Sequence, residues 1–85
     1  MARRNKFDGK MLKELRKNTP YSQLELAQIL GISRETVSAI ENEKPGTIDN
    51  ISIEIIRKWH EACQGYIDAT TEFNFKTLIT KFFGF

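Results

Sequence analysis

Apolar residues recur along the chain at the spacing of α-helices, and no stretch alternates apolar and polar residues over the length of a β-strand. These periods predict helices at about residues 8–18, 22–30, 34–42 and 48–63. In the tail, apolar residues at i, i+3, i+4, i+7 and i+8 predict a fifth helix, with Phe75, Leu78, Ile79, Phe82 and Phe83 on one face. Residues 66–73 are also compatible with an extended segment. The pattern predicts an all-α chain.

Capping residues predict where the helices begin and end. The first helix ends before Thr19-Pro20, because proline disfavours helical backbone in the residue before it. Ser22 and Glu25 have the spacing of a capping box, in which each side chain binds a backbone N–H of the other residue. Gly31 is expected to end the second helix, since glycine readily adopts the left-handed backbone conformation.

The sequence from Gln23 to Asn42, QLELAQILGISRETVSAIEN, has the pattern of two helices joined by a tight turn. Ala27 is small where the two helices would touch, Gly31 supplies the turn, and Ser33 is expected to cap the second helix. Apolar residues would hold this second helix against the first: Ile32, Val37 and Ile40. The opposite face of the second helix then projects outward with Arg34, Glu35, Ser38, Ala39 and Asn42.

In this stretch the chain resembles the phage-repressor and Cro-type helix-turn-helix family. The resemblance covers about residues 12–59 and rests on LKELRKN, YSQLELAQILGIS and RETVSAIENEKPG. It implies a compact four- to five-helix bundle, a lambda-repressor-like DNA-binding domain. The helix after Ser33 would be the recognition helix, which enters the major groove of double-stranded DNA. The resemblance also implies a buried ion pair of Arg16 and Glu41 with a structural role.

The resemblance places base-reading side chains at Ser33, Arg34, Glu35, Ser38 and Ala39. Arginine can donate two hydrogen bonds to guanine, glutamate can accept one from cytosine, and a serine hydroxyl can do either. The methyl group of Ala39 can contact thymine. The alternative interpretation is that Ser33 is only a cap and that Arg34 and Glu35 are ordinary surface charges.

A second set of residues is expected to contact the DNA backbone. By the resemblance, Gln23 and Asn42 hold phosphates and so fix the position of the protein on the duplex. Lys44 lies in the predicted loop beyond the recognition helix. Near the amino terminus, a basic arm would follow the backbone or enter the minor groove with Arg3, Arg4 and Lys6. The alternative for this arm is a disordered terminus that only improves solubility.

The formal net charge of +2 is unevenly distributed. Residues 1–17 contain seven Lys or Arg and two acidic residues, whereas the rest of the chain contains more acidic than basic residues. Positive charge gathered at one end favours an anionic partner such as nucleic acid. An ordinary solvated surface is the alternative interpretation.

The composition excludes several other classes. A chain of 85 residues forms one domain. Cys63 is the only cysteine, and together with His60 it provides too few ligands for a metal site. Since no motif of catalytic or cofactor-binding residues is visible, we expect no cofactor, no metal and no enzyme activity. No secretion signal or long apolar run is visible, so we expect no membrane insertion and a cytoplasmic location at the nucleoid of a bacterial host.

Two features depart from the family pattern. Leu24 and Ile29 stand where the motif more often has polar residues, so they are either boundary residues or a patch that faces a partner. The tail is richer in aromatic residues than a four-helix core requires. Its helix could cap the core, and we also expect it to form a homodimer interface, since the two roles are compatible. The residues of that interface would be Phe75, Leu78, Ile79, Phe82 and Phe83.

The sequence therefore predicts three parts: a basic arm (residues 1–7), a helix-turn-helix DNA-binding domain (8–65) and an aromatic tail for dimerisation (66–85). The predicted function is that of a sequence-specific transcriptional regulator, a small phage or bacterial Cro or repressor protein that occupies an operator. The alternative is a protein-interaction module of the same fold, which binds and modulates another repressor or a toxin.

Overall fold

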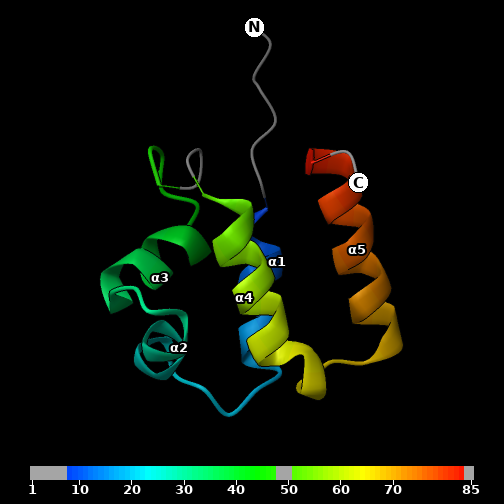
Figure 1. The fold of residues 1–85 in the computed structure, drawn as a ribbon, viewed down its shortest axis with the longest axis horizontal. Helices are drawn as coiled ribbons and strands as arrows, with labels where there is room; N and C mark the ends of the chain where they lie inside the picture. Colours follow the sequence, from blue (N-terminus) through cyan, green and yellow to red (C-terminus); the bar gives the residue numbers. More distant parts are fainter. Residues whose placement is uncertain (1–7, 48–50, 84–85) are drawn as a thin grey trace, which may run out of the picture.

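The computed structural model describes residues 8–47 and 51–83, except for the side chains of Phe82 and Phe83. These residues form five α-helices and no strand: α1 (Gly9–Lys17), α2 (Gln23–Leu30), α3 (Arg34–Glu41), α4 (Ile53–Cys63) and α5 (Ala69–Phe83). A short 3₁₀ turn (Gln64–Tyr66) follows α4. Figure 1 shows α2 and α3 on one side of α4 and α5 on the other side. The predicted all-α bundle is confirmed.

The predicted caps are present at the ends of the first helices. The Ser22 hydroxyl accepts from the Glu25 N–H, and the Glu25 carboxylate accepts from the Ser22 N–H, which completes the capping box. Gly31 ends α2 in the left-handed conformation, with φ of 76°. At the start of α1, the Asp8 carboxylate accepts from the Lys10 N–H. The boundaries of α1 to α3 were thus predictable from local chemistry.

Side chains from all five helices meet in one core among the described residues. Trp59 of α4 is fully buried, and its indole N–H donates to the Leu12 carbonyl of α1 over 2.9 Å. A buried indole N–H needs such a partner, so this bond sets the position of α4 along α1. The other buried apolar residues are Leu12, Leu15, Leu26, Ala27, Leu30, Val37, Ile40, Ile56, Cys63 and Phe75.

The prediction for α4 was wrong at its start. Residues 48–50 lie outside the described residues, and α4 begins at Ile53 because the Ser52 hydroxyl caps the Ile55 N–H. Helix α4 buries one face against the core. Its fully buried residues are Ile56, Trp59 and Cys63, whereas Ile51, Ile55 and Ala62 lie at the edge of the core.

The alternative of an extended segment at residues 66–73 was also wrong, although Ile67 itself is extended. Helix α5 begins at Ala69, and the Asp68 carboxylate accepts from the Thr71 N–H over 2.8 Å in its first turn. This bond favours the ionised carboxylate and so lowers the pKa of Asp68. The described helices include none that is long and apolar enough to cross a membrane.

His60 of α4 contacts two residues of α5. The His60 ring stacks on Phe75 with ring centres 4.7 Å apart, and its Nε2 lies 2.7 Å from a carboxylate oxygen of Glu72. The hydrogen bond with His60 lowers the pKa of Glu72. Phe75 is only 3% exposed, so this ring caps the core of its own chain, while Phe73 is 69% exposed.

Candidate nucleic-acid interface

Helices α2 and α3 are joined by a turn of three residues, Gly31 to Ser33. The N–H groups of Gly31 and Ile32 both donate to the Ala27 carbonyl, over 2.8 and 3.0 Å. Ala27 is buried where a larger side chain would separate the helices, and Val37 is buried beneath α3. The apolar face of α3 is therefore held inward, which leaves its polar face at the surface.

The outward face of α3 borders a shallow hollow of about 460 Å³. The hollow brings together most of the residues predicted to contact DNA: Arg34, Glu35, Ser38, Ala39, Asn42 and Lys44, with Pro45 beside them. Arg34 and Glu35 are exposed, and Ser38 and Ala39 are partly buried. Within the described part of the chain, the Arg34 guanidinium has no carboxylate within 4 Å. This face thus presents free donors and acceptors to the solvent.

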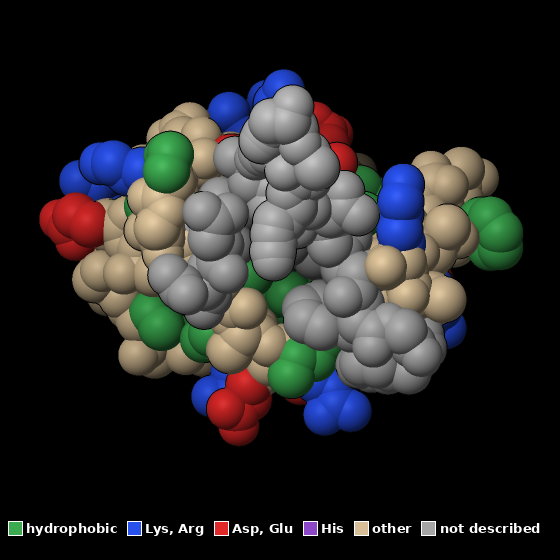
Figure 2. Space-filling view, turned by 90° about the horizontal axis from the view of Figure 1, so that it is seen from above, with side chains coloured by type: hydrophobic (Ala, Val, Ile, Leu, Met, Phe, Trp, Pro, Cys, Tyr) green, Lys and Arg blue, Asp and Glu red, His purple; other side chains and the backbone are tan. Residues whose placement is uncertain are grey.

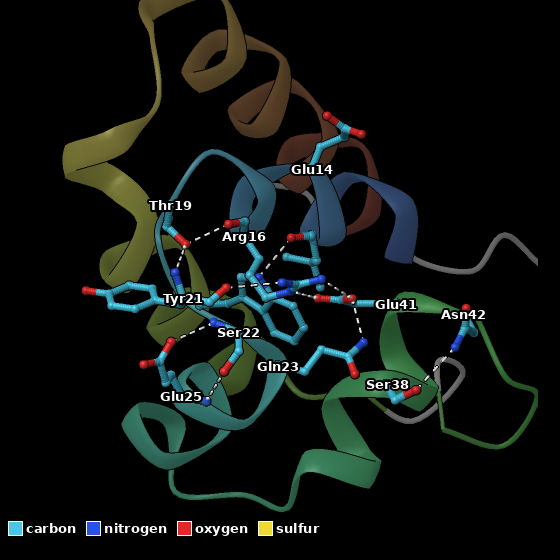
Figure 3. A network of polar contacts seen from close by, with 12 residues as sticks. Glu14, Arg16, Thr19, Tyr21, Ser22, Gln23, Glu25, Ser38, Glu41 and Asn42 are labelled. Atoms are coloured by element: carbon cyan, nitrogen blue, oxygen red, sulfur yellow. Dashed lines mark hydrogen bonds and ion pairs between the residues drawn. The ribbon is translucent and has the colours of Figure 1, made fainter.

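Three of the predicted contact residues on this face also form hydrogen bonds within the chain. The Ser33 hydroxyl accepts from the Thr36 N–H over 3.1 Å and lies 2.9 Å from the Thr36 hydroxyl, so its predicted capping role is confirmed. The Asn42 amide donates to the Ser38 hydroxyl over 3.3 Å (Figure 3). These bonds all lie at the surface, where a ligand can compete for the same groups.

Glu41 holds three helices together at the inner end of the site (Figure 3). Its carboxylate is bound by the guanidinium of Arg16 in α1, with Nε at 2.6 Å and a terminal nitrogen at 3.1 Å. The amide of Gln23 in α2 donates to the same carboxylate over 3.0 Å. The predicted pair of Arg16 and Glu41 is therefore present, and the Gln23 amide nitrogen faces Glu41.

Gly9 is a positioning residue that the sequence analysis missed. A Cβ atom at this buried glycine would lie 2.0 Å from the Ile40 carbonyl oxygen and 2.9 Å from Cγ of Glu43. The Glu43 carboxylate also accepts from the Lys10 N–H over 3.2 Å. The first turn of α1 therefore fits directly against the end of α3, and only glycine leaves enough room.

His60 and Cys63 have different surroundings in the structure. His60 bonds to Glu72, and Cys63 is buried in the core, where burial raises the pKa of its thiol to about 11. No three His, Cys, Asp or Glu residues gather at one point within residues 8–47 and 51–83. Arg3, Arg4 and Lys6 of the predicted arm lie outside the described residues.

Comparison with known families agrees with this geometry. A family model described as a helix-turn-helix domain matches residues 9–63, which is more than half of the chain. The chain belongs to this helix-turn-helix domain family. A search of curated proteins and a search of solved structures each give no match.

We expect Gly9→Ala to destabilise the protein, because the added methyl group would collide with backbone at the end of α3. Overpacking of this kind costs about 1–3 kcal/mol, and each kcal/mol lowers the Tm of so small a domain by roughly 4–8 °C. Thermal unfolding followed by circular dichroism measures the change. The matched control is Gly65→Ala, whose Cβ would meet no atom within 4 Å. Equal Tm values for the two variants would contradict the close approach.

We expect Arg16→Ala to lower the free energy of unfolding by about 3–5 kcal/mol, since it leaves the Glu41 carboxylate buried without its cation. Urea unfolding measures this change, with exposed Arg57→Ala as the control. The double variant Arg16→Met, Glu41→Leu should be more stable than Arg16→Ala, because no unpaired charge stays buried. A stability of Arg16→Ala equal to that of the parent protein would refute a structural role.

Proposed function

We propose that the protein is a sequence-specific DNA-binding transcriptional regulator of the phage-repressor and Cro type. It acts by occupying an operator and excluding polymerase in a bacterial host. The observation that carries this proposal is the outward face of α3, where polar groups border one open hollow. The DNA major groove is wide enough for an α-helix, and its base edges present donors and acceptors to such groups.

Each residue of the hollow has a role that suits its chemistry. Arg34 reads guanine with two parallel hydrogen bonds, Glu35 accepts from cytosine, and Ala39 contacts a thymine methyl group. The hydroxyls of Ser38 and Ser33 exchange their internal bonds for bonds to base edges or phosphates.

Other residues hold the DNA backbone and so set the position of α3. Asn42 and Lys44 lie at the end of the hollow, beside the phosphates that border the groove. Gln23 is the first residue of α2, where free backbone N–H groups attract a phosphate while its side-chain amide nitrogen stays on Glu41. The basic arm adds contacts to the neighbouring backbone through Arg3, Arg4 and Lys6.

We expect Arg34→Ala to weaken binding to the operator by roughly 5- to 150-fold, which corresponds to the 1–3 kcal/mol of one bidentate base contact. Affinity for a random duplex should change much less. Fluorescence anisotropy with duplexes from the DNA that flanks the gene measures both affinities. The control is Lys58→Ala, which removes one exposed cation from α4. An equal loss on both duplexes would show that Arg34 reads no base.

A second candidate function is supported by Leu24 and Ile29, which are each 50% exposed on α2. A protein-interaction module of the same fold would use these side chains to bind another repressor or a toxin. The same titration separates the two functions. Absence of DNA binding even at low salt would favour the interaction module, because non-specific binding to DNA is strongest there.

We also propose that the protein acts as a homodimer. One recognition helix reads about four base pairs, whereas a two-fold dimer reads two half-sites about 34 Å apart. Phe75 is already buried within its own chain, and Leu78 and Ile79 pack partly against the core. The exposed ring of Phe73, on the side of α5 away from the buried Phe75, supports a contact through the tail.

We expect Phe73→Ser to shift the protein from dimer to monomer. The substitution removes an apolar ring, 69% exposed in the single chain, from the proposed interface. Sedimentation equilibrium measures the mass against the 9.9 kDa of one chain. Leu24→Ser removes an exposed apolar side chain from α2 and should leave the dimer intact. A parent protein that stays monomeric at all concentrations would refute the dimer.

A further inference from the structure

Three lysines lie on one face of α1, at the spacing i, i+3 and i+7: Lys10, Lys13 and Lys17. They border a second hollow, of about 360 Å³, together with Glu14, Glu41 and Asn42. Asn42 also borders the hollow in front of α3. The lysine face of α1 is thus continuous with the proposed base-reading surface at the end of the recognition helix.

These three lysines form no ion pair within the described part of the chain. None of the three ammonium groups has a carboxylate oxygen within 4 Å, whereas Lys76 of α5 lies 3.5 Å from Glu72. Glu41 is already occupied by Arg16 and Gln23. Glu43 and Asp8 direct their carboxylates to the Lys10 backbone N–H, over 3.2 and 3.0 Å.

The hollow also contains Glu14, and no hydrogen bond or ion pair is seen for its carboxylate among the described residues. The Glu14 backbone carbonyl accepts from the Asn18 side-chain amide. Figure 2 shows Lys and Arg side chains around the rim of one face of the molecule, with Asp and Glu side chains among them. Among the described residues, the lysine face therefore presents three ammonium groups without an ion-pair partner next to α3.

We propose that Lys10, Lys13 and Lys17 form a phosphate-binding face that holds the DNA backbone beside the end of α3, an inference that rests on the proposed DNA-binding function. Lysine suits this role because its ammonium is a flexible point charge that reads no base. From Lys10 to Lys17 the helix rises by about 10 Å, and one DNA strand presents about three phosphates over such a length. The face orients α3 in the groove and contributes affinity that does not depend on sequence.

The test is the salt dependence of DNA binding by the full chain. Log K falls as log salt concentration rises, and each lost phosphate contact makes this negative slope shallower by about 0.9. The double variant Lys13→Gln, Lys17→Gln should therefore make it shallower by about 1.8. This change in slope should be the same on operator and random duplexes. The control Lys58→Gln, Lys81→Gln removes the same charge from exposed positions of α4 and α5, and should leave the slope nearly unchanged. Thermal unfolding verifies that each variant is folded.

Glu14→Gln supplies a test of the opposite sign. Removing this carboxylate from the hollow should tighten binding to both duplexes at low salt, because a like charge no longer faces the phosphates. If the lysine variant and its control have the same slope while Arg34→Ala still weakens operator binding, the phosphate-binding face is refuted and the proposed function stands. If the parent protein binds no DNA at low salt, both proposals are refuted.

Discussion

The Glu41 carboxylate is only 3% exposed and is the one buried charged group among the described residues. It lies at the end of α3, and its partners Arg16 and Gln23 belong to α1 and α2. A buried carboxylate without partners would cost several kcal/mol, so the three helices are constrained to arrive at one point. Ile40 and Leu15 belong to the apolar core, but apolar packing is non-directional and does not fix the angle between the helices. This polar cluster therefore fixes how α3 is oriented relative to the rest of the bundle.

The end of α3 is held a second time by the first turn of α1, where Gly9 touches the Ile40 carbonyl. With both constraints in place, the polar face of α3 is fixed before any partner binds, and little ordering is required on association. Helix α5 is attached differently, through the contacts of His60, one buried ring, Phe75, and the partly buried Leu78 and Ile79. The helix-turn-helix is thus held to α1 by several specific contacts, whereas α5 is held to the core by fewer contacts.

Local chemistry explains which features could be predicted from the sequence. The capping box at Ser22, the left-handed Gly31 and the apolar stripe of α3 involve residues that are neighbours in the chain, and all are confirmed. The features that were missed join residues far apart. The contact of Gly9 with Ile40 and the bond from Trp59 to Leu12 depend on how helices meet, which periodicity does not determine. The late start of α4 was missed because an apolar run does not reveal which serine caps the helix.

The central claim is that the outward face of α3 enters a DNA groove, and amide chemical shifts test it most directly. The protein, labelled with ¹⁵N, would be titrated with a short duplex at low salt. The account predicts that the largest changes fall on residues 33–42, while the indole signal of Trp59, buried against Leu12, stays in place. Large changes confined to α5, with residues 33–42 unaffected, would contradict the account.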